Sequence, residues 1–314
     1  MLAMWQEQCL WMRTNFMQLN TSLMEAIKAT SEAVERVLDP VLTPGKGMEA
    51  QLVEAMRYSM FSGGKRLRPI LVLASAAVFD VPKAQAIRVG AAIECVHCMS
   101  LIHDDLPAMD DDDLRRGKPT CHKQYDEATA ILAGDSLLLI ATELLAHEST
   151  HSDSNVRIKL IASLMHAAGH AGMMGGQMID ILAENRDLSE AEIHRLQHMK
   201  TGALITFSVT AGAILANATE QEFHALQGYS HDLGLAFQIA DDLLDVEGSE
   251  EEMGKAIGKD EQAGKATLVS IMGVERAKQQ ARLLADQAIE HLSIFDEKAN
   301  LLRALAHFAI NRRN

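Results

Sequence analysis

The feature that most constrains the fold is a long helical pattern of apolar residues over positions 84–105, which ends just before Pro107. Aromatic residues make up only 4% of the chain, and Ala, Leu, Met and Ile predominate. Ala and Leu favour helices, whereas the β-branched and aromatic runs typical of strands are scarce. With 314 residues, 48% of them hydrophobic, the chain can bury a large core. The sequence therefore predicts an all-α bundle.

Apolar spacing, prolines and capping signals predict where the other helices lie. We expect helices over residues 23–38, 48–60, 69–79, 84–105, 129–145, 156–182, 189–199, 219–246, 268–289 and 299–310. Pro69 is expected at the first position of a buried helix, and Asp39-Pro40 at the end of an earlier one. No linker is visible, so we expect an N-terminal tail (residues 1–20) and one domain (residues 21–314).

The bulk properties exclude several functions. A net charge of −14 without a basic surface run argues against a nucleic-acid partner. No unbroken apolar run reaches the roughly 18 residues of a membrane span, and the N-terminus lacks a secretory pattern, so we expect a cytoplasmic protein without membrane insertion. Cys95-Val96-His97-Cys98 has the spacing of a redox or zinc site, but no second pair follows, and we interpret both cysteines as core residues.

A cluster of carboxylates follows the long helix. Its six aspartates are Asp104, Asp105, Asp110, Asp111, Asp112 and Asp113. Carboxylates this close repel one another unless cations neutralise them, and hard oxygen donors favour Mg²⁺ or Ca²⁺. Arg115 and Arg116, directly after the cluster, are placed to meet an anion.

A second acidic group lies near the end of a later helix. Gln238, Asp241, Asp242 and Asp245 recur at i, i+3, i+4 and i+7, which places them on one face of an otherwise apolar helix. A solvated acidic face is the alternative explanation. Two acidic sites together indicate metal ions held between helices, and such ions could bind a diphosphate in the core of a bundle.

Basic residues complete an anion site. Gly63-Gly64 precedes Lys65-Arg66-Leu67-Arg68 at the start of a buried helix. Glycine lets backbone N–H groups approach a phosphate, so this segment is predicted to be an anion-binding loop. Further cations along the chain are Arg115, Arg116, Lys200, Lys255 and Lys265.

The order of these motifs resembles the trans-isoprenyl diphosphate synthases, in particular their short-chain bacterial farnesyl diphosphate branch. The motifs are Gly63-Gly64-Lys65-Arg66-Leu67-Arg68-Pro69, the DDxxxxD set Asp104, Asp105 and Asp110 with Arg115-Arg116-Gly117, Gly175-Gly176-Gln177 with Asp180, Lys200-Thr201-Gly202, Phe237-Gln238, and the DDxxD set Asp241, Asp242 and Asp245. Each motif alone is modest, but six in order are specific. The resemblance extends from about residue 23 to the C-terminus.

The resemblance implies a helical bundle around a deep central cavity and a head-to-tail condensation of isopentenyl diphosphate with an allylic diphosphate. It also implies three Mg²⁺ ions per active site and a homodimer. By its motifs, the metal ligands would be Asp104, Asp105, Asp110, Asp241 and Asp245. Arg115, Lys200, Lys255 and Lys265 would contact the allylic diphosphate, and Lys65, Arg68, His97 and Arg116 would bind isopentenyl diphosphate.

The chemistry that the resemblance implies is electrostatic. Cations stabilise the charge that develops on the leaving diphosphate. An apolar cavity shields the allylic cation from water while the Thr201 hydroxyl and the Gln238 amide oxygen offer it dipoles. A lone histidine such as His97 is more often a core residue, but it lies two helical turns before Asp104, on the same face.

Met99 is where the sequence departs from that branch. Farnesyl diphosphate synthases of this type usually carry an aromatic residue five positions before the first aspartate, and this residue limits chain growth. Methionine is more flexible than tyrosine, so a geranylgeranyl diphosphate synthase with a C20 product is the alternative to the C15 product.

Two other classes fit less well. A terpene cyclase would have Asn, Ser or Thr with Glu in its second metal site and would lack the basic loop. A non-enzymatic metal-binding protein or an inactive regulatory subunit would have lost some charged motif residues, and none is missing here.

Overall fold

The computed structural model describes residues 2–183, 186, 188–247 and 268–311, with side chains from residue 22 onward. The N-terminal half consists of α1 (Leu2–Val41), α2 (Ala50–Met60), α3 (Leu67–Val78), α4 (Lys83–Asp104), the two-residue strands β1 (Leu114–Arg115) and β2 (Lys118–Pro119), α5 (Cys121–Gln124), α6 (Glu127–Ala146) and α7 (Ser154–Ala168). The C-terminal half consists of α8 (Met173–Ala183), α9 (Glu190–Gln197), the π-helix η1 (His198–Gly202), α10 (Ala203–Ala216), α11 (Glu220–Glu247), α14 (Leu268–Met272), α15 (Val274–His291), the 3₁₀ turns η2 (Leu292–Ile294) and η3 (Glu297–Ala299), and α16 (Asn300–Asn311).

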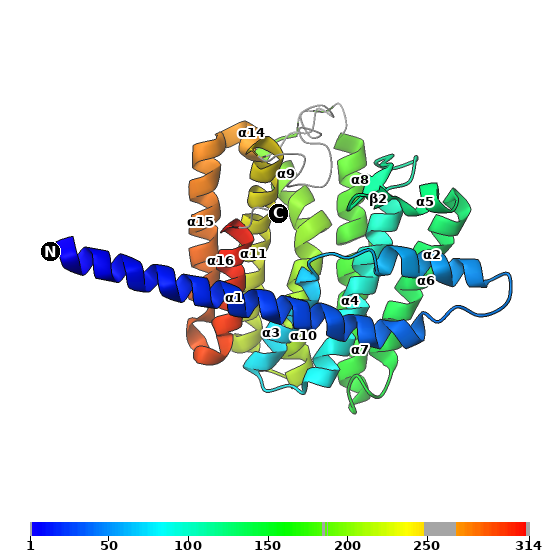
Figure 1. Ribbon diagram of the computed structural model, residues 1–314, viewed down its shortest axis with the longest axis horizontal. Helices are drawn as coiled ribbons and strands as arrows, with labels where there is room; N and C mark the ends of the chain where they lie inside the picture. The colour runs from blue at the N-terminus through cyan, green and yellow to red at the C-terminus, as the bar shows by residue number, and fades with distance from the viewer. Residues whose placement is uncertain (1, 184–185, 187, 248–267, 312–314) are drawn as a thin grey trace.

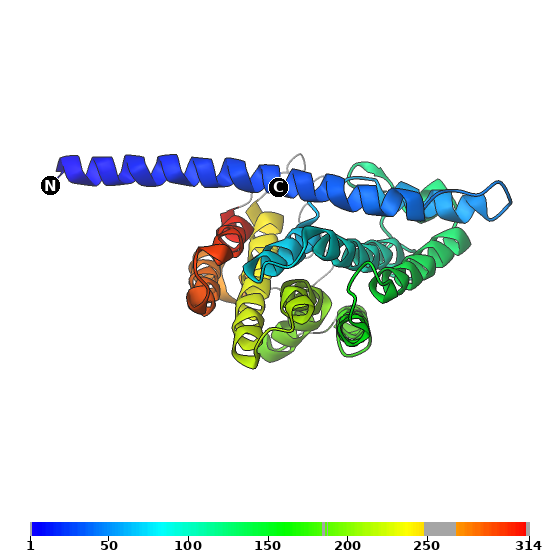
Figure 2. The ribbon, with the colours of Figure 1, turned by 90° about the horizontal axis from the view of Figure 1, so that it is seen from below.

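The helices form one bundle, as the all-α prediction required (Figure 1). Helix α1 lies along one side of this bundle, and its N-terminal part extends past α15 and α16 (Figure 2). The strands β1 and β2 form a small antiparallel hairpin in the loop after α4. This hairpin, which the sequence analysis did not predict, carries Arg115 and the residues that follow it.

Helix α3 lies at the centre of the bundle because most of its residues are apolar or small and are buried. It packs closely on α10, where a Cβ atom on Gly212 would lie only 2.4 Å from the Ala76 nitrogen. The small residue thus allows two backbones to approach, which is how a deep core is built from helices. The same packing brings the N-terminus of α3, with its basic loop, next to α4.

The predicted segments correspond to helices, but several boundaries differ. The predicted stop at Asp39-Pro40 is wrong, because α1 runs without a break from Leu2 to Val41 with Pro40 inside its last turn. The helix therefore crosses residue 20, and the division into a tail and a domain stays a prediction. Pro69 is the third residue of α3 rather than the first, which is still within the turn whose N–H groups lack intrahelical partners.

Glycines divide two segments that were predicted to be continuous. The segment 156–182 is broken between α7 and α8, where a Cβ on Gly172 would lie 2.1 Å from the Ala167 carbonyl oxygen. The segment 268–289 is broken at Gly273, whose φ of 80° lies in the left-handed region. Both predicted capping boxes form: Ser189 with Glu192, and Thr219 with Glu222.

By length and mean hydropathy alone, three described helical spans could cross a membrane, although none is an unbroken apolar run. They are Lys83–Asp104, Glu127–Ala146 and Glu190–Ala216. In the first and third, 67% of the apolar window is buried inside the bundle, so the protein core accounts for most of their hydrophobicity. In α6 the figure is 39%.

Candidate active site

A cavity of about 410 Å³ lies between α4, α8 and the segment from η1 to α10. Its lining residues are Arg68, His97, Met99, Ser100, Leu101, His103, Asp104, Met109, Met173, Met174, Gln177, Met178, Ile181, Lys200, Thr201 and Leu204. Apolar side chains, many of them methionines, therefore share this space with a carboxylate and several cations. A cavity of this kind can hold a ligand with an apolar body and a charged end.

Met99 is one of the buried residues of this wall, with only 2% of its surface exposed. It lies five residues before Asp104 on α4 and lines the same cavity. The predicted position of the length-limiting residue is therefore in contact with the apolar space. Because methionine side chains are flexible, the volume below Asp104 can adapt to the ligand.

Asp104 ends α4, and the loop after Pro107 folds back onto it. The Asp110 N–H donates a hydrogen bond of 2.8 Å to the Asp104 carbonyl oxygen, which brings two of the predicted metal ligands together. Burial raises the pKa of Asp104 to about 6; the Lys200 ammonium opposes this rise, and the Asp110 carboxylate adds to it. A divalent cation would favour the ionised carboxylate at this position.

Asp105 is buried and forms an ion pair with Arg115 of the hairpin. The Arg115 Nε donates to both Asp105 oxygens at 2.7 and 2.9 Å, and its Nη2 lies 2.6 Å from Oδ1. The sequence analysis assigned Asp105 to metal ions and Arg115 to a diphosphate. The structure pairs these two residues with each other, since a buried carboxylate is most stable next to a guanidinium.

Lys200 and Thr201 lie on η1, a π-helical turn between α9 and α10. The Lys200 Nζ lies 2.6 Å from Asp180 Oδ2 on α8. A Cβ on Gly176 would lie 2.3 Å from the Lys200 nitrogen, so this glycine lets α8 approach the π-helix. π-Helical turns are frequent at functional sites because they re-aim side chains. Asp180 belonged to a recognised motif, but the sequence analysis gave it no role.

The second acidic motif connects to the cavity through Thr201. The Thr201 hydroxyl donates to Gln238 Oε1 at 3.1 Å, and Gln238 Nε2 donates to Asp242 Oδ1 at 2.8 Å. Asp242 is buried, whereas Asp241 and Asp245 are partly exposed on the same helix. Gln238, Asp241 and Asp245 are not among the described residues that line the cavity. The hydrogen-bonded chain from Asp242 through Gln238 therefore reaches the cavity at Thr201.

A second, smaller cavity of about 30 Å³ also lies along α4 and shares the lining residues His97 and Leu101 with the large one. His97, Arg115 and Arg116 line it, and His97 lines the large cavity as well. Burial, followed by the charges of Arg68 and Arg116, holds the pKa of His97 well below its usual range, so the imidazole is neutral. His97 and Arg116, both predicted to bind isopentenyl diphosphate, thus face one space together with Arg115, which was predicted to contact the allylic diphosphate.

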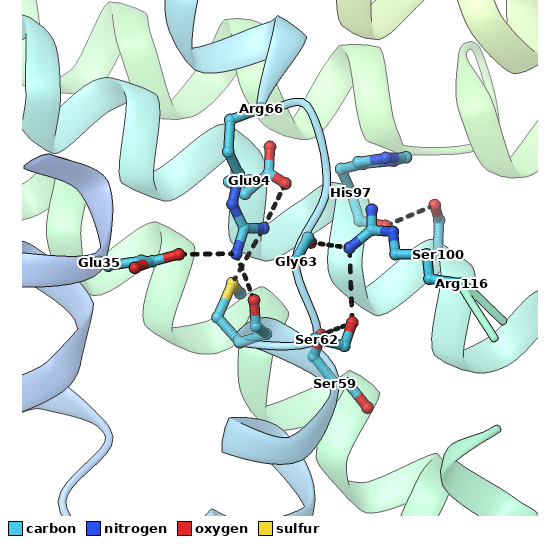
Figure 3. Close-up of polar contacts among 10 residues, drawn as sticks. Glu35, Ser59, Ser62, Gly63, Arg66, Glu94, His97, Ser100 and Arg116 are labelled. Atoms are coloured by element: carbon cyan, nitrogen blue, oxygen red, sulfur yellow. Dashed lines mark hydrogen bonds and ion pairs between the residues drawn. The ribbon is translucent and has the colours of Figure 1, made fainter. Parts of the chain in front are cut away.

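Arg116 holds the glycine loop. Its guanidinium donates to the Gly63 carbonyl oxygen and lies 3.5 Å from the Ser62 hydroxyl (Figure 3). Gly64 has a φ of 122°, which lies in the region that favours glycine, and a Cβ there would also lie 2.6 Å from that guanidinium. Lys65, the next residue, is exposed.

Arg66 corrects the prediction that the whole basic segment faces an anion. Its side chain is 1% exposed and turns into the protein, where Nη1 lies 2.6 Å from Glu94 Oε1 (Figure 3). Glu94 was not among the predicted site residues. The available signal was its position three residues before His97, on the same face of α4.

Lys255 and Lys265, which were predicted to contact the allylic diphosphate, lie outside the described residues.

Cys95 and Cys98 are both buried. Burial raises the pKa of the Cys95 thiol and brings the pKa of Cys98 to about 12. They are core residues, as interpreted from the sequence.

The metal site was tested against the described side chains. Among residues 22–183, 188–247 and 268–311, no three His, Cys, Asp or Glu side chains converge on one point. The donor chemistry nevertheless fits Mg²⁺, because burial and then the nearby Asp110 carboxylate raise the pKa of Asp104, and carboxylate oxygens are the donors that this cation prefers.

A family model and several known proteins match most of the chain. A family model described as polyprenyl synthetase matches residues 49–305. The chain is 42% identical to a geranylgeranyl diphosphate synthase from Cyanophora paradoxa, covering 95% of this chain and 99% of the relative, and 41% identical to the farnesyl diphosphate synthase of Escherichia coli, covering 94% and 99%. A solved FPP/GFPP synthase from Zymomonas mobilis superposes with a TM-score of 0.85 at 45% identity, covering 92% and 99% of the two chains.

A helical bundle with a cation-rich and carboxylate-bearing apolar cavity, together with these relatives, defines a prenyltransferase. The chain belongs to the polyprenyl synthetase family, in its short-chain trans branch. Its substrates are isoprenoid diphosphates, as the family implies.

Proposed function

We propose that the protein condenses isopentenyl diphosphate with dimethylallyl and geranyl diphosphates to give (2E,6E)-farnesyl diphosphate and diphosphate. The observation that carries this proposal is His97, which lines both the large apolar cavity and the small basic one. Two diphosphate substrates bound in these two cavities would meet at this point. The large cavity suits the allylic chain, and the small one lies among cations.

On the allylic side, Asp104, Asp105, Asp110, Asp241 and Asp245 would hold Mg²⁺, as the resemblance implies. When bound, Mg²⁺ neutralises charge on the leaving diphosphate and so favours cleavage of the C–O bond. Lys200 adds a positive charge at the same wall, and its pairing with Asp180 leaves two further N–H donors on the ammonium. Arg115, Lys255 and Lys265 would contact the same diphosphate.

On the isopentenyl side, Lys65, Arg68, His97 and Arg116 would bind the second diphosphate. A neutral His97 can donate one N–H to a phosphate oxygen while Arg68 and Arg116 supply the charge.

The cavity wall accounts for the fate of the allylic cation. Apolar side chains such as Met99 and Leu204 exclude water, so the cation reacts with the alkene instead, and the released diphosphate can accept the proton that the condensed product then loses. The Thr201 hydroxyl oxygen can present a lone pair to the cation because its hydrogen is donated to Gln238. Gln238 then acts mainly by orienting Thr201.

Product length is the second candidate question. Relatives of this chain include both farnesyl and geranylgeranyl diphosphate synthases. The flexible side chain of Met99 in the cavity wall supports a C20 product as the alternative. We propose C15 as the main product. Mg²⁺, a homodimeric state and a cytoplasmic location accompany this proposal as predictions.

The test is an assay with radiolabelled isopentenyl diphosphate, Mg²⁺ and each of the C5, C10 and C15 allylic diphosphates. Turnover of the C5 and C10 substrates, ending at C15, is the expected result. Turnover of the C15 substrate to C20 would favour the alternative, and no turnover with any substrate would refute the proposal.

A further inference from the structure

The Arg66 guanidinium joins segments that are distant in sequence. It contacts Glu94 on α4 at 2.6 Å, donates to the Met60 carbonyl oxygen at the end of α2, and lies 3.9 Å from Glu35 on α1. Both side chains of the Arg66 and Glu94 pair are 3% exposed or less (Figure 3). One side chain thereby fixes the start of α3 against three other helices.

Stability alone is a weak reason for this pair. Removing two charges from water is costly, and a well-packed apolar pair of similar size is often equally stable. Within the described part of the chain, Arg66 Nε and Glu94 Oε2 are buried without a hydrogen-bond partner. Incompletely satisfied buried polar groups call for a functional explanation.

The backbone of Arg66 supplies one. Its φ of 49° and ψ of 42° lie in the left-handed region, which is unfavourable for a residue with a Cβ. This turn sends the Arg66 side chain inward, whereas Lys65 stays exposed and Arg68 lines the large cavity. The ion pair with Glu94 stabilises this turn. The turn directs Arg66 into the protein and leaves Lys65 and Arg68 outside it.

The other partner of the pair acts on α4. Glu94 lies three residues before His97, so one helical turn connects the buried carboxylate to the imidazole between the two cavities. On its opposite side, the same loop is held by Arg116 through Gly63. The loop is thus fixed from within by Arg66 and from outside by Arg116.

We propose that Arg66 and Glu94 are positioning residues that set the spacing of Lys65, Arg68 and His97 around the diphosphate of the isopentenyl substrate. The inference rests on the proposed function, since it assigns that diphosphate to these three residues. It adds two residues that line the small cavity but are paired with each other, so they act by placing their neighbours rather than by binding the diphosphate. Small misplacements of binding groups cost large factors in rate or affinity.

The test compares the wild-type enzyme with the double variant Arg66→Met/Glu94→Leu, which replaces the ion pair by an apolar one. We expect the KM for isopentenyl diphosphate to rise about tenfold or more, while the KM for geranyl diphosphate changes by less than about twofold. Thermal unfolding is measured in parallel. A merely structural pair would lower the unfolding temperature and leave both KM values unchanged or shift them equally.

Two single variants keep the test decisive if the double variant does not fold. Glu94→Gln preserves shape and one hydrogen bond, and Arg66→Lys preserves charge but cannot span Glu94 and the Met60 carbonyl together. Each should raise the KM for isopentenyl diphosphate selectively, by a smaller factor. The matched control is Arg57→Met, since Arg57 on α2 forms a 2.7 Å ion pair with Asp39 on α1.

The outcomes separate the two proposals. Wild-type turnover with unchanged KM values in all three variants would overturn the positioning role alone. A wild-type enzyme that does not condense isopentenyl diphosphate with any allylic diphosphate would overturn the proposed function and the positioning role together.

Discussion

Lys200 Nζ on the π-helix lies 2.6 Å from Asp180 Oδ2 on α8, and Lys200 lines the large cavity beside Asp104. This ion pair fixes the direction in which the ammonium points, because a lysine side chain otherwise has many rotamers. The helix α8 and the π-helix η1, which are separated in the sequence by α9, thus together orient one charge.

Asp180→Asn should weaken the orientation of the Lys200 ammonium. We expect kcat/KM for the allylic diphosphate to fall by about tenfold to a hundredfold, because Lys200 loses its charged partner but not its own charge. Steady-state kinetics with geranyl diphosphate measures the effect. Asp80→Asn is the control, since Asp80 forms a 2.5 Å ion pair with Lys298 at an exposed site. An equal loss in both variants would contradict the prediction.

Asp104→Asn should abolish activity and yet stabilise the metal-free protein. The folded-state pKa of Asp104, about 6, lies above its ordinary value of 3.8, so ionisation at neutral pH opposes folding. We expect the unfolding temperature of the variant to exceed that of the wild-type protein by about 3 °C or more in EDTA. Adding Mg²⁺ should raise the unfolding temperature of the wild-type protein only. A Mg²⁺-dependent rise of equal size in the variant would contradict Asp104 as a metal ligand.

His97→Gln should change the pH dependence of stability. The pKa of His97 is lowered in the folded protein, so between that value and the ordinary value of 6.5 the unfolded chain binds more protons. Stability associated with His97 is therefore full above pH 6.5 and is lost as the pH falls. Urea unfolding at pH 7.5 and at pH 5.5 should show a smaller decrease for the variant than for the wild-type protein. His307→Gln, at an exposed position, should behave as the wild-type protein does.

Met99→Tyr should shorten the product if Met99 limits the cavity. A rigid aromatic ring in this 2% exposed position would fill space below Asp104 and confine products to C15 or less. Met99→Ala should have the opposite effect and extend the product. Chromatography of the dephosphorylated products measures the chain length that each variant makes. Met48→Tyr, at a 96% exposed position, serves as the control, and an unchanged product from both Met99 variants would place the limit elsewhere.

Gly212→Ala should destabilise the bundle without a direct effect on the site. The added Cβ would lie 2.4 Å from the Ala76 nitrogen, and backbone cannot move aside as a side chain can. We expect the free energy of unfolding to fall by about 2 kcal/mol or more. Gly234→Ala is the control, because its Cβ would lie 3.5 Å from Gly202, an ordinary contact. Equal unfolding free energies for the two variants would contradict this account of α3 and α10.

The fold class and most of the helices could be predicted from the sequence, because helical periodicity, capping boxes and prolines act locally. It also predicted that Asp104, Lys200 and Thr201 belong to one site, since each lies in a motif whose order along the chain is characteristic. Met99 was expected in the cavity wall because the resemblance to farnesyl diphosphate synthases implies a length-limiting residue five positions before Asp104. All four line the large cavity.

The packing of the helices determines which charged side chains line a cavity and which pair with one another. Arg66 and Arg68 are two residues apart in one basic segment, yet a left-handed turn buries the first against Glu94 while the second lines the cavity. Similarly, Arg115 pairs with Asp105, whereas its neighbour Arg116 holds the glycine loop. Charge type and spacing do not fix these choices, because each depends on which oppositely charged group a distant helix brings within hydrogen-bonding distance.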